Sequence, residues 1–290
     1  MSEHINIHIQ EEQAYSIHIG KGLFSNLLPK SEWLKGGNTA FLLADERVAE
    51  LYASQIETLQ ETLQSDAHLL IIRSGEQSKN IGDFEKAVDF LLSNGVSRQS
   101  PLIAIGGGVT GDLSAFVAST VMRGIPLIHV ATTLLAMVDS SIGGKTGINH
   151  QMGKNLIGTF YQPKVVYCDT NFLSTLDRRD WINGLSEILK YGLIRDPAMI
   201  QECKKQTAQA DFRNPEQWVG LIRKSVAIKA DIVEKDTKEL GLRELLNFGH
   251  TFGHALENFT GYGSINHGEA VFAGMLAELE LGRLLGFESG

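Results

Sequence analysis

Short apolar runs alternate with helix-patterned segments through the first half of the chain, and this alternation restricts the possible folds more than any other feature. Segments 46–64 and 81–94, which separate some of these runs, repeat apolar residues at helical spacing. Strands that alternate with helices build a parallel sheet with both faces covered, so we expect an α/β fold. The strand-like runs are TAFLLAD (39–45), HLLIIR (68–73), PLIAIGGG (101–108) and PLIHVATT (126–133).

The strand pattern stops after about residue 175, and the rest of the chain is patterned as helices. No low-complexity linker and no internal repeat marks the change, which falls near residues 169–176. We therefore expect residues 1–174 to form an α/β dinucleotide-binding domain with a parallel sheet, and residues 175–290 to form a mainly helical domain that binds metal and substrate. The segments with helical spacing are 181–195, 216–236, 242–259 and 268–286.

Composition excludes several functional classes. The net charge is −8 and no basic run is present, so we expect no nucleic-acid partner. No apolar stretch approaches the roughly 18 residues of a membrane span, so we expect no membrane segment. The N-terminus, MSEHINIHIQEEQ, alternates like an edge strand and lacks the pattern of a signal peptide. Two cysteines, Cys168 and Cys203, are too few for a disulfide framework, which indicates free thiols and a cytoplasmic location.

A glycine cluster in LIAIGGGVTGD follows an apolar strand and precedes a helix expected at 113–121. Glycine lets backbone N–H groups approach a pyrophosphate, and a helix N-terminus favours the negative charge. The cluster departs from GxGxxG, so a tight structural turn is the alternative. Asp45 follows the first strand, where it could contact a ribose or cap a helix. Glu76 and Lys79 lie in the polar loop SGEQSKN, either as ligand contacts or as solvated charges.

Two further polar stretches suit the binding of polyols and phosphates. LLAMVDSSIGGKTGIN carries Asp139 and Lys145 on either side of serines and glycines, and MGKNLIG adds Lys154 and Asn155. Such a concentration of polar groups and glycines is poorly suited to a core, so we predict that this region binds a ligand.

Carboxylate and imidazole groups in the second half suit a divalent metal. Glu187 and Lys190 lie three residues apart in SEILKYG, His250 and His254 lie four apart in NFGHTFGHALE, and His267 follows in INHGEA. Glutamate with histidine indicates zinc or a similar transition metal. Spacing alone pairs His250 with His254 as ligands, and ordinary helix histidines are the alternative.

Taken together and in order, five segments resemble the 3-dehydroquinate synthase family of sugar-phosphate cyclases, over essentially the whole chain. The resemblance implies an α/β NAD-binding domain, a helical metal and substrate domain, and NAD with Zn²⁺, for which Co²⁺ is a possible substitute. The segments are GGGVTGD, VMRGIPLIHVATTLLAMVDSSIGGKTGIN, GKNLIGTFYQP, GLSEILKYG and NFGHTFGHALE.

The resemblance also implies roles for individual residues. It makes Glu187, His250 and His267 the metal ligands and moves His254 to the substrate, in contrast to the spacing argument. It places Arg123 in the phosphate pocket of a neighbouring subunit, which implies a homodimer. The other substrate-binding or catalytic positions are Asp139, Lys145, Asn155, Lys190, Lys229, Arg243 and Asn247. The NAD-binding positions are Asp45, Glu76, Lys79, Gly107, Gly108, Val109, Asp112, Thr132, Thr133, Lys145, Lys154, Phe172, Thr175 and Leu176.

The implied reaction converts 3-deoxy-D-arabino-heptulosonate 7-phosphate to 3-dehydroquinate and phosphate, with NAD regenerated in each turnover. The sequence leaves three alternatives open. They are a cyclase that acts on another phosphorylated sugar, a metal-dependent polyol or alcohol dehydrogenase, and a chain that binds NAD without turnover. The chain that binds NAD without turnover is an alternative because of the segment GRLLGFESG at the end of the sequence. The resemblance implies further C-terminal helices with a phosphate-binding lysine, and we expect these to be missing.

Overall fold

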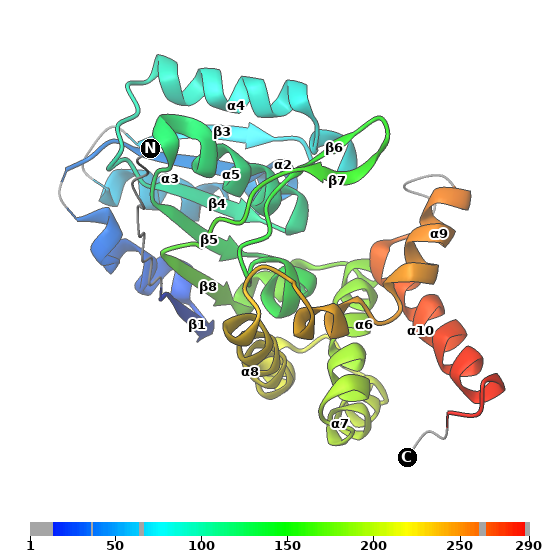
Figure 1. Ribbon diagram of the computed structural model, residues 1–290. Helices are drawn as coiled ribbons and strands as arrows, with labels where there is room; N and C mark the ends of the chain where they lie inside the picture. The colour runs from blue at the N-terminus through cyan, green and yellow to red at the C-terminus, as the bar shows by residue number, and fades with distance from the viewer. Residues whose placement is uncertain (1–13, 36, 64–66, 261–264, 288–290) are drawn as a thin grey trace, which may run out of the picture.

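A six-stranded, entirely parallel sheet forms the first part of the molecule, in the order β1-β8-β5-β4-β2-β3 (Figure 1). The computed structural model describes residues 14–35, 37–63, 67–260 and 265–287; the edge strand expected in segment 1–13 lies outside them. The α/β fold predicted from the alternating pattern is confirmed. The strands are β1 (Ser16–Gly20), β2 (Ala40–Asp45), β3 (Ala67–Ile72), β4 (Leu102–Gly106), β5 (Leu127–Ala131) and β8 (Val165–Asp169), and a separate antiparallel hairpin joins β6 (Ile148–His150) to β7 (Gly153–Ile157).

Successive side chains of the central strands enter cores on opposite faces of the sheet. Phe41 and Leu43 of β2 pack in the core that contains residues of α4 and α5, whereas Leu42 and Ala44 pack in the core that contains residues of α3. This burial on both faces explains why the strands are continuous apolar runs. The helices of this part are α1 (Leu23–Asn26), α2 (Glu46–Leu51), α3 (Ala53–Thr62), α4 (Ile81–Ser93) and α5 (Gly108–Thr120).

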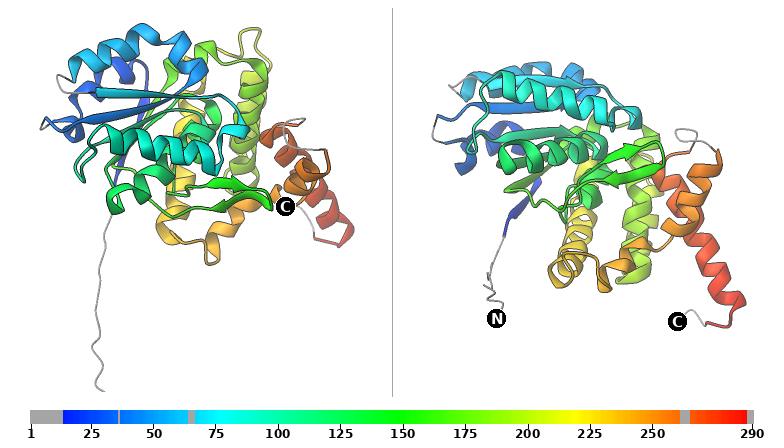
Figure 2. Two further views of the ribbon diagram at one scale, coloured as in Figure 1. Left: turned by 90° about the horizontal axis from the view of Figure 1, so that it is seen from above. Right: turned by 45° about the horizontal axis from the view of Figure 1, so that its top comes forward.

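After β8, the described residues form helices and no further strand. Helices α6, α7 and α8 gather beside β5, β8 and β1, and α9 and α10 lie beyond α6 (Figures 1 and 2). Trp181 and Ile188 of α6 share a core with Val166 and Cys168 of β8, which fixes α6 against the sheet. None of the described helices is long and apolar enough to cross a membrane. The helices are α6 (Arg178–Ile194), α7 (Ala198–Thr207), α8 (Val219–Lys235), α9 (His250–Thr260) and α10 (His267–Leu284).

Several helix boundaries differ from the sequence prediction. The segment predicted as one helix at 46–64 breaks at Tyr52 into α2 and α3. The helix predicted at 113–121 begins earlier, at Gly108, so the glycines form its first turn. The segment 242–259 divides into a 3₁₀ turn, Leu242–Asn247, and helix α9, which begins at His250. Gly249 separates them with a φ of 82°, which glycine adopts easily.

Helices α9 and α10 cross with almost no space between their backbones. A Cβ atom built on Gly274 of α10 would lie 1.9 Å from the carbonyl oxygen of Gly249 and 2.9 Å from the backbone nitrogen of Gly253. Only glycine permits such an approach. This crossing brings the first residue of α9, His250, near the first residue of α10, His267, with ring centroids 5.2 Å apart.

Replacement of Gly274 by alanine is therefore expected to force α9 and α10 apart. We expect the free energy of unfolding to fall by about 2–3 kcal/mol, in the upper range for overpacked sites, as measured by urea denaturation. Gly282→Ala on the same helix is the matched control, because nothing lies within 4 Å of a Cβ built there. That control should be neutral or stabilising by up to about 1 kcal/mol. Equal stability of the two variants would contradict the close crossing.

Candidate active site

A cavity of about 1430 Å³ opens where the carboxyl ends of the sheet strands face helices α6, α8, α9 and α10. Ligands of open α/β sheets bind at this edge. Nearly all residues that the sequence analysis selected line the cavity, although they come from across the whole chain. They are Asp45, Glu76, Lys79, Gly107, Gly108, Val109, Asp112, Thr132, Thr133, Asp139, Lys145, Lys154, Asn155, Phe172, Thr175, Leu176, Lys190, Lys229, Arg243, Asn247, His250, His254 and His267.

Two selected residues do not line the cavity. Glu187 is fully buried behind its wall, although its carboxylate reaches the histidines. Arg123 is exposed and lies elsewhere, in a short turn after α5. Both Met122 and Arg123 have positive φ, 52° and 65°, which is a strained conformation for side-chain-bearing residues. The structure therefore separates Arg123 from the cavity of its own chain.

The wall that carries the glycine turn is built around the N-terminus of α5. The backbone of Gly107 passes so close to Thr133 that a Cβ on Gly107 would lie 2.9 Å from the Thr133 Cγ2 atom. Gly107 and Gly108 line the cavity at the start of this helix, and a helix N-terminus favours a bound anion. Asp45 caps α2 by accepting from the backbone N–H groups of Arg47 and Val48, and it also lines the cavity, so its two predicted roles are compatible.

Buried Lys79 and half-buried Asp112 form an ion pair in the same wall, which joins the loop after β3 to helix α5. Burial raises the pKa of Asp112, while the charge and hydrogen bond of Lys79 oppose that rise. Nearby, the Glu76 carboxylate accepts a hydrogen bond of 2.7 Å from the side chain of Asn149. These pairs hold the loop charges in place against the cavity.

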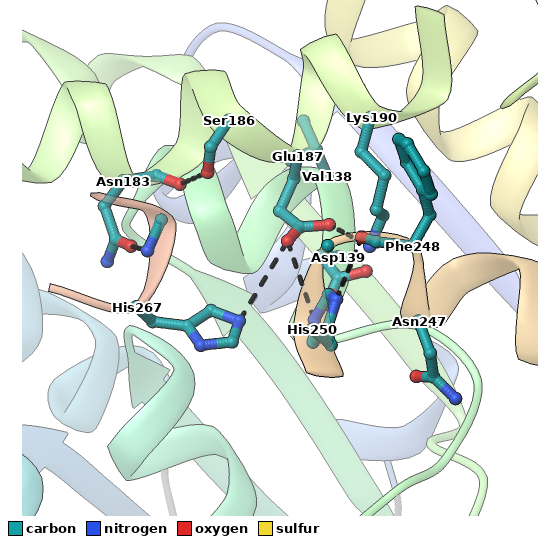
Figure 3. Close-up of polar contacts among 12 residues, drawn as sticks. Val138, Asp139, Asn183, Ser186, Glu187, Lys190, Asn247, Phe248, His250 and His267 are labelled. Carbon is teal, nitrogen blue, oxygen red and sulfur yellow. Dashed lines mark hydrogen bonds and ion pairs between the residues drawn. The ribbon is translucent and has the colours of Figure 1, made fainter. Parts of the chain in front are cut away.

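A carboxylate and two imidazoles converge on the opposite wall. Glu187 of α6 has no exposed surface, and its Oε1 atom lies 3.9 Å from Nε2 of His250 and 4.0 Å from Nε2 of His267 (Figure 3). The Oε1 atom of Glu187 has no hydrogen-bond partner among the described residues. A buried oxygen without a partner is costly, and a metal ion would satisfy it. The donor set of one carboxylate and two imidazoles also matches the ligands that zinc prefers.

The two imidazoles lie in different electrostatic environments. Burial, with the nearby positive charge of Lys190, lowers the pKa of His250 to about 3. Burial would also lower the pKa of His267, but Glu257 and Glu187 raise it above its usual value. Lys190 also forms an ion pair with Glu187, three residues earlier on α6. His254 does not face Glu187; it groups with Glu257 and His267 instead. The pairing of His250 with His254 that spacing favoured is therefore not the arrangement around the buried carboxylate.

Asp139 is the centre of a half-buried network that joins residues of α6 and α8. Lys229 of α8 donates hydrogen bonds of 2.6 Å to Oδ1 and 2.7 Å to the backbone oxygen of Asp139. Tyr191 donates to the same Oδ1 at 2.9 Å. Burial alone would raise the pKa of Asp139, but the charges of Lys229 and Lys190 hold it far below its usual range. Burial lowers the pKa of Lys229, and Asp139 opposes that shift.

Cationic groups line a further part of the cavity. Arg243 is almost fully buried, and its guanidinium donates to the backbone oxygens of Thr237 at 2.8 Å and Gly143 at 3.0 Å. Its Nε atom has no partner among the described residues. Lys145 pairs with Glu239 at 2.5 Å, and the same carboxylate accepts from Asn247 at 3.1 Å. Both contacts of Glu239 are therefore to residues that were selected as substrate contacts.

The sequence analysis missed three residues that organise this site, namely Tyr191, Glu239 and Glu257. Glu257 follows His250 by seven residues and His254 by three, so helical spacing alone could have placed it on the same face. No comparable signal existed for Glu239, whose approach to Lys145 depends on a loop with a φ of 60° at that residue. Tyr191 reaches Asp139 only because α6 packs against the π-helical turn Ala136–Ser140.

Comparison with solved structures identifies the class of fold and site. The chain superposes on 2-epi-5-epi-valiolone synthase from Streptomyces hygroscopicus subsp. jinggangensis, determined with NAD⁺ and Zn²⁺ bound, with a TM-score of 0.86 and 30% identity over 98% of this chain and 82% of that one. It also superposes on 2-deoxy-scyllo-inosose synthase complexed with carbaglucose-6-phosphate, NAD⁺ and Co²⁺, with a TM-score of 0.81 and 27% identity over 93% and 74%. The fold is that of the sugar-phosphate cyclases.

Sequence comparisons narrow this class to one family. Residues 69–183 match the model of the 3-dehydroquinate synthase N-terminal region, and residues 184–289 match that of the C-terminal region. A 3-dehydroquinate synthase of Syntrophotalea carbinolica is 43% identical over 272 residues, which is 94% of this chain and 75% of that relative. The chain therefore belongs to the 3-dehydroquinate synthase family, and it is an enzyme of the lyase class.

The Asp139–Lys229 pair is expected to be strongly coupled. Asp139→Asn leaves the buried Lys229 cation without its counter-charge, and we expect a loss of about 3–5 kcal/mol in the free energy of unfolding. The double variant Asp139→Asn/Lys229→Met should lose less than the sum of the single variants, by roughly 1–3 kcal/mol, in urea denaturation at neutral pH. Strictly additive losses would show that the pair makes no joint contribution.

The same pair predicts a pH dependence. The folded pKa of Asp139 lies below its unfolded value, which is about 3.9 for an aspartate. Its stabilising contribution is therefore complete above about pH 4 and is lost as the pH falls through the folded pKa. The stability difference between the unsubstituted chain and Asp139→Asn should be nearly constant between about pH 5 and pH 7 and should shrink in stronger acid. It should also shrink at alkaline pH, because burial without Asp139 makes Lys229 lose its proton more easily.

Proposed function

We propose that the cavity catalyses the conversion of 3-deoxy-D-arabino-heptulosonate 7-phosphate to 3-dehydroquinate and phosphate, with NAD and a divalent metal as cofactors. The observation that carries the proposal is the buried Glu187 carboxylate, which faces the imidazoles of His250 and His267. These imidazoles line the same cavity as the glycine turn of α5. A reaction that combines hydride transfer with polarisation of a hydroxyl needs a nicotinamide site and a metal site in one cavity. When bound, NAD would take up and return a hydride, and the metal would act as a Lewis acid on the substrate oxygen.

Glu187, His250 and His267 would hold the metal, and the N-terminus of α5 would hold the pyrophosphate of NAD. Asp45 would lie at the ribose side, since it ends β2 at the same edge of the sheet. The other proposed NAD contacts are Glu76, Lys79, Val109, Asp112, Thr132, Thr133, Lys145, Lys154, Phe172, Thr175 and Leu176, all of which line the cavity.

The cationic groups suit a substrate that carries both a carboxylate and a phosphate. The chain has a net charge of −8, so binding such an anion requires a local concentration of positive charge. Lys145, Lys190, Lys229 and Arg243 supply it within one cavity. Arg243 suits bidentate contact with a carboxylate, and burial excludes the water that would compete for it.

Asp139 would accept a hydrogen bond from a ring hydroxyl of the substrate. Lys229 and Tyr191 hold its carboxylate in one orientation, and its low pKa keeps it an acceptor. Asn155, Asn247 and His254 would complete the polar surface around the substrate, with His254 toward the phosphate. These fixed groups position the substrate before the chemical steps, which is where most of the rate enhancement of such a site would arise.

The proposed metal role of Glu187 is tested by phosphate release in the presence of Zn²⁺ and NAD. We expect the unsubstituted chain to release phosphate without net accumulation of NADH, and Glu187→Ala to release it slower by at least about 100-fold. Glu216→Ala is a control, because that carboxylate is exposed and outside the cavity. Equal phosphate release by the unsubstituted chain and Glu187→Ala would reject the role. Faster turnover of sedoheptulose 7-phosphate would indicate a different cyclase substrate.

We also infer a homodimer in which Arg123 reaches the cavity of the neighbouring subunit. We further infer that the protein is located in the cytoplasm. The strained, exposed backbone at 122–123, away from the cavity of its own chain, supports the dimer. The two buried free thiols, Cys168 and Cys203, are compatible with a reducing compartment.

Subunit mixing tests the dimer. Arg123→Ala and Glu187→Ala should each have little activity alone, because each lacks one part of every site. A mixture refolded together should recover about a quarter of the unsubstituted activity, since half of the dimers then contain one complete site. Absence of recovery, with mixed dimers verified by mass spectrometry, would show that Arg123 does not act across subunits.

A further inference from the structure

A second buried carboxylate, Glu257, lies beside the proposed metal ligands without belonging to the set around Glu187. It is on the inner face of α9, one turn after His254, and its side chain is 3% exposed. Its Oε1 atom lies 3.0 Å from Nζ of Lys154 and 3.8 Å from Nδ1 of His267. The Glu257 carboxylate therefore lies between a lysine of the β6–β7 hairpin and a proposed metal ligand.

His267 lies between two carboxylates that face its two ring nitrogens. Nε2 is 4.0 Å from Oε1 of Glu187, and Nδ1 is 3.8 Å from Oε1 of Glu257. A neutral imidazole carries one proton, and only the unprotonated nitrogen can bind a metal. An acceptor at Nδ1 retains the proton there and leaves the Nε2 lone pair directed toward Glu187.

His250 has a different partner for the corresponding nitrogen. Its Nδ1 atom lies 3.3 Å from the backbone oxygen of Phe248. The orientation of one proposed ligand is therefore set by the backbone, whereas that of His267 depends on a side chain that can be substituted. This difference makes the role of Glu257 accessible to experiment.

We propose that Glu257 is a positioning residue, which holds the Nδ1 proton of His267 and so directs Nε2 to the metal. The proposal rests on the metal site of the proposed function. The present separation of 3.8 Å is longer than a hydrogen bond, and a ring movement of about 1 Å closes it. Such carboxylate–histidine pairs orient metal ligands and raise their basicity.

Glu257 also connects the metal side of the cavity to the cofactor side. Its ion-pair partner Lys154 belongs to β7, and the β6–β7 hairpin extends toward α9 in both views of Figure 2. A purely structural role as the partner of Lys154 is the competing explanation. The two explanations differ in what happens to metal affinity when Lys154 is removed and Glu257 stays.

The decisive comparison is between Lys154→Met and Lys154→Met/Glu257→Met. Both lack the ion pair, and Lys154→Met retains the Glu257 carboxylate beside His267. Zinc affinity is measured by competition with a chromophoric chelator, without NAD or substrate. We expect Lys154→Met to bind Zn²⁺ within about threefold of the unsubstituted chain, and the double variant to bind about 10–100-fold more weakly. Lys154→Met/Glu257→Gln, which keeps an acceptor for the Nδ1 proton, should recover part of the loss of the double variant.

The visible absorption spectrum of the Co²⁺-loaded protein gives a second readout, because it reports the geometry of the ligands. It should change in the double variant and remain unchanged in Lys154→Met. Equal zinc affinity of these two variants would overturn the proposal, whether both bind Zn²⁺ as tightly as the unsubstituted chain or both bind it more weakly. If the double variant does not fold, Glu257→Asp replaces it; that variant keeps the charge near Lys154 and withdraws the carboxylate from His267. Unchanged zinc affinity of Glu257→Asp would then overturn the proposal.

Two control variants separate this proposal from the function on which it rests. His267→Ala should weaken Zn²⁺ binding more than any change at Glu257, because it removes a ligand. His254→Ala should leave the affinity nearly unchanged; a loss as large as that of His267→Ala would make Glu257 a direct ligand in a different metal set and overturn its positioning role. If Glu187→Ala and His267→Ala both bind Zn²⁺ as tightly as the unsubstituted chain, the proposed metal site itself is wrong.

Discussion

The carboxylate of Glu187 lies inside the protein with no exposed surface, and the arrangement around it depends on how that buried group is compensated. Removing a carboxylate from water costs several kcal/mol unless cations, hydrogen bonds or a metal replace the lost hydration. Lys190 satisfies one side, and the imidazoles of His250 and His267 face the other. Helices α6, α9 and α10 must therefore meet at one point, and the close crossing of α9 and α10 at Gly274 makes that meeting possible.

The alternating pattern of the first half predicted the α/β fold, because a parallel sheet buried on both faces requires continuous apolar strands. The position of the glycine turn before α5 followed from the same pattern. Helix breaks were less accessible: the division at Gly249 depends on how tightly α9 packs on α10, which is a tertiary contact. Strand β8, which pairs with both β1 and β5, was not predicted, because the β6–β7 hairpin and not a helix-patterned segment precedes it.

Local motifs identified some site residues, whereas contacts between distant segments could not be read from the sequence. Residues on regular elements, such as His250 and Lys190, could be recognised from motifs because the helix fixes their direction. Local spacing nevertheless paired His250 with His254, whereas the structure groups His250 with Glu187 and His267, which are far away in the chain. Glu239 could not be found at all, because its contact with Lys145 joins two loops across the cavity. Long-range geometry of this kind is absent from a single sequence.

The wide separation of Glu187, His250 and His267 along the chain has a consequence for folding. A metal ion bound to all three would close one loop of 63 residues and another of 17, the differences between successive positions in the sequence. Such a closure restricts the unfolded chain in the way that a disulfide does, and the restriction grows with loop length. The ion would thus act as a reversible cross-link that fastens the last two helices to α6. Metal supply would then govern the lifetime of the folded protein as well as its rate of turnover.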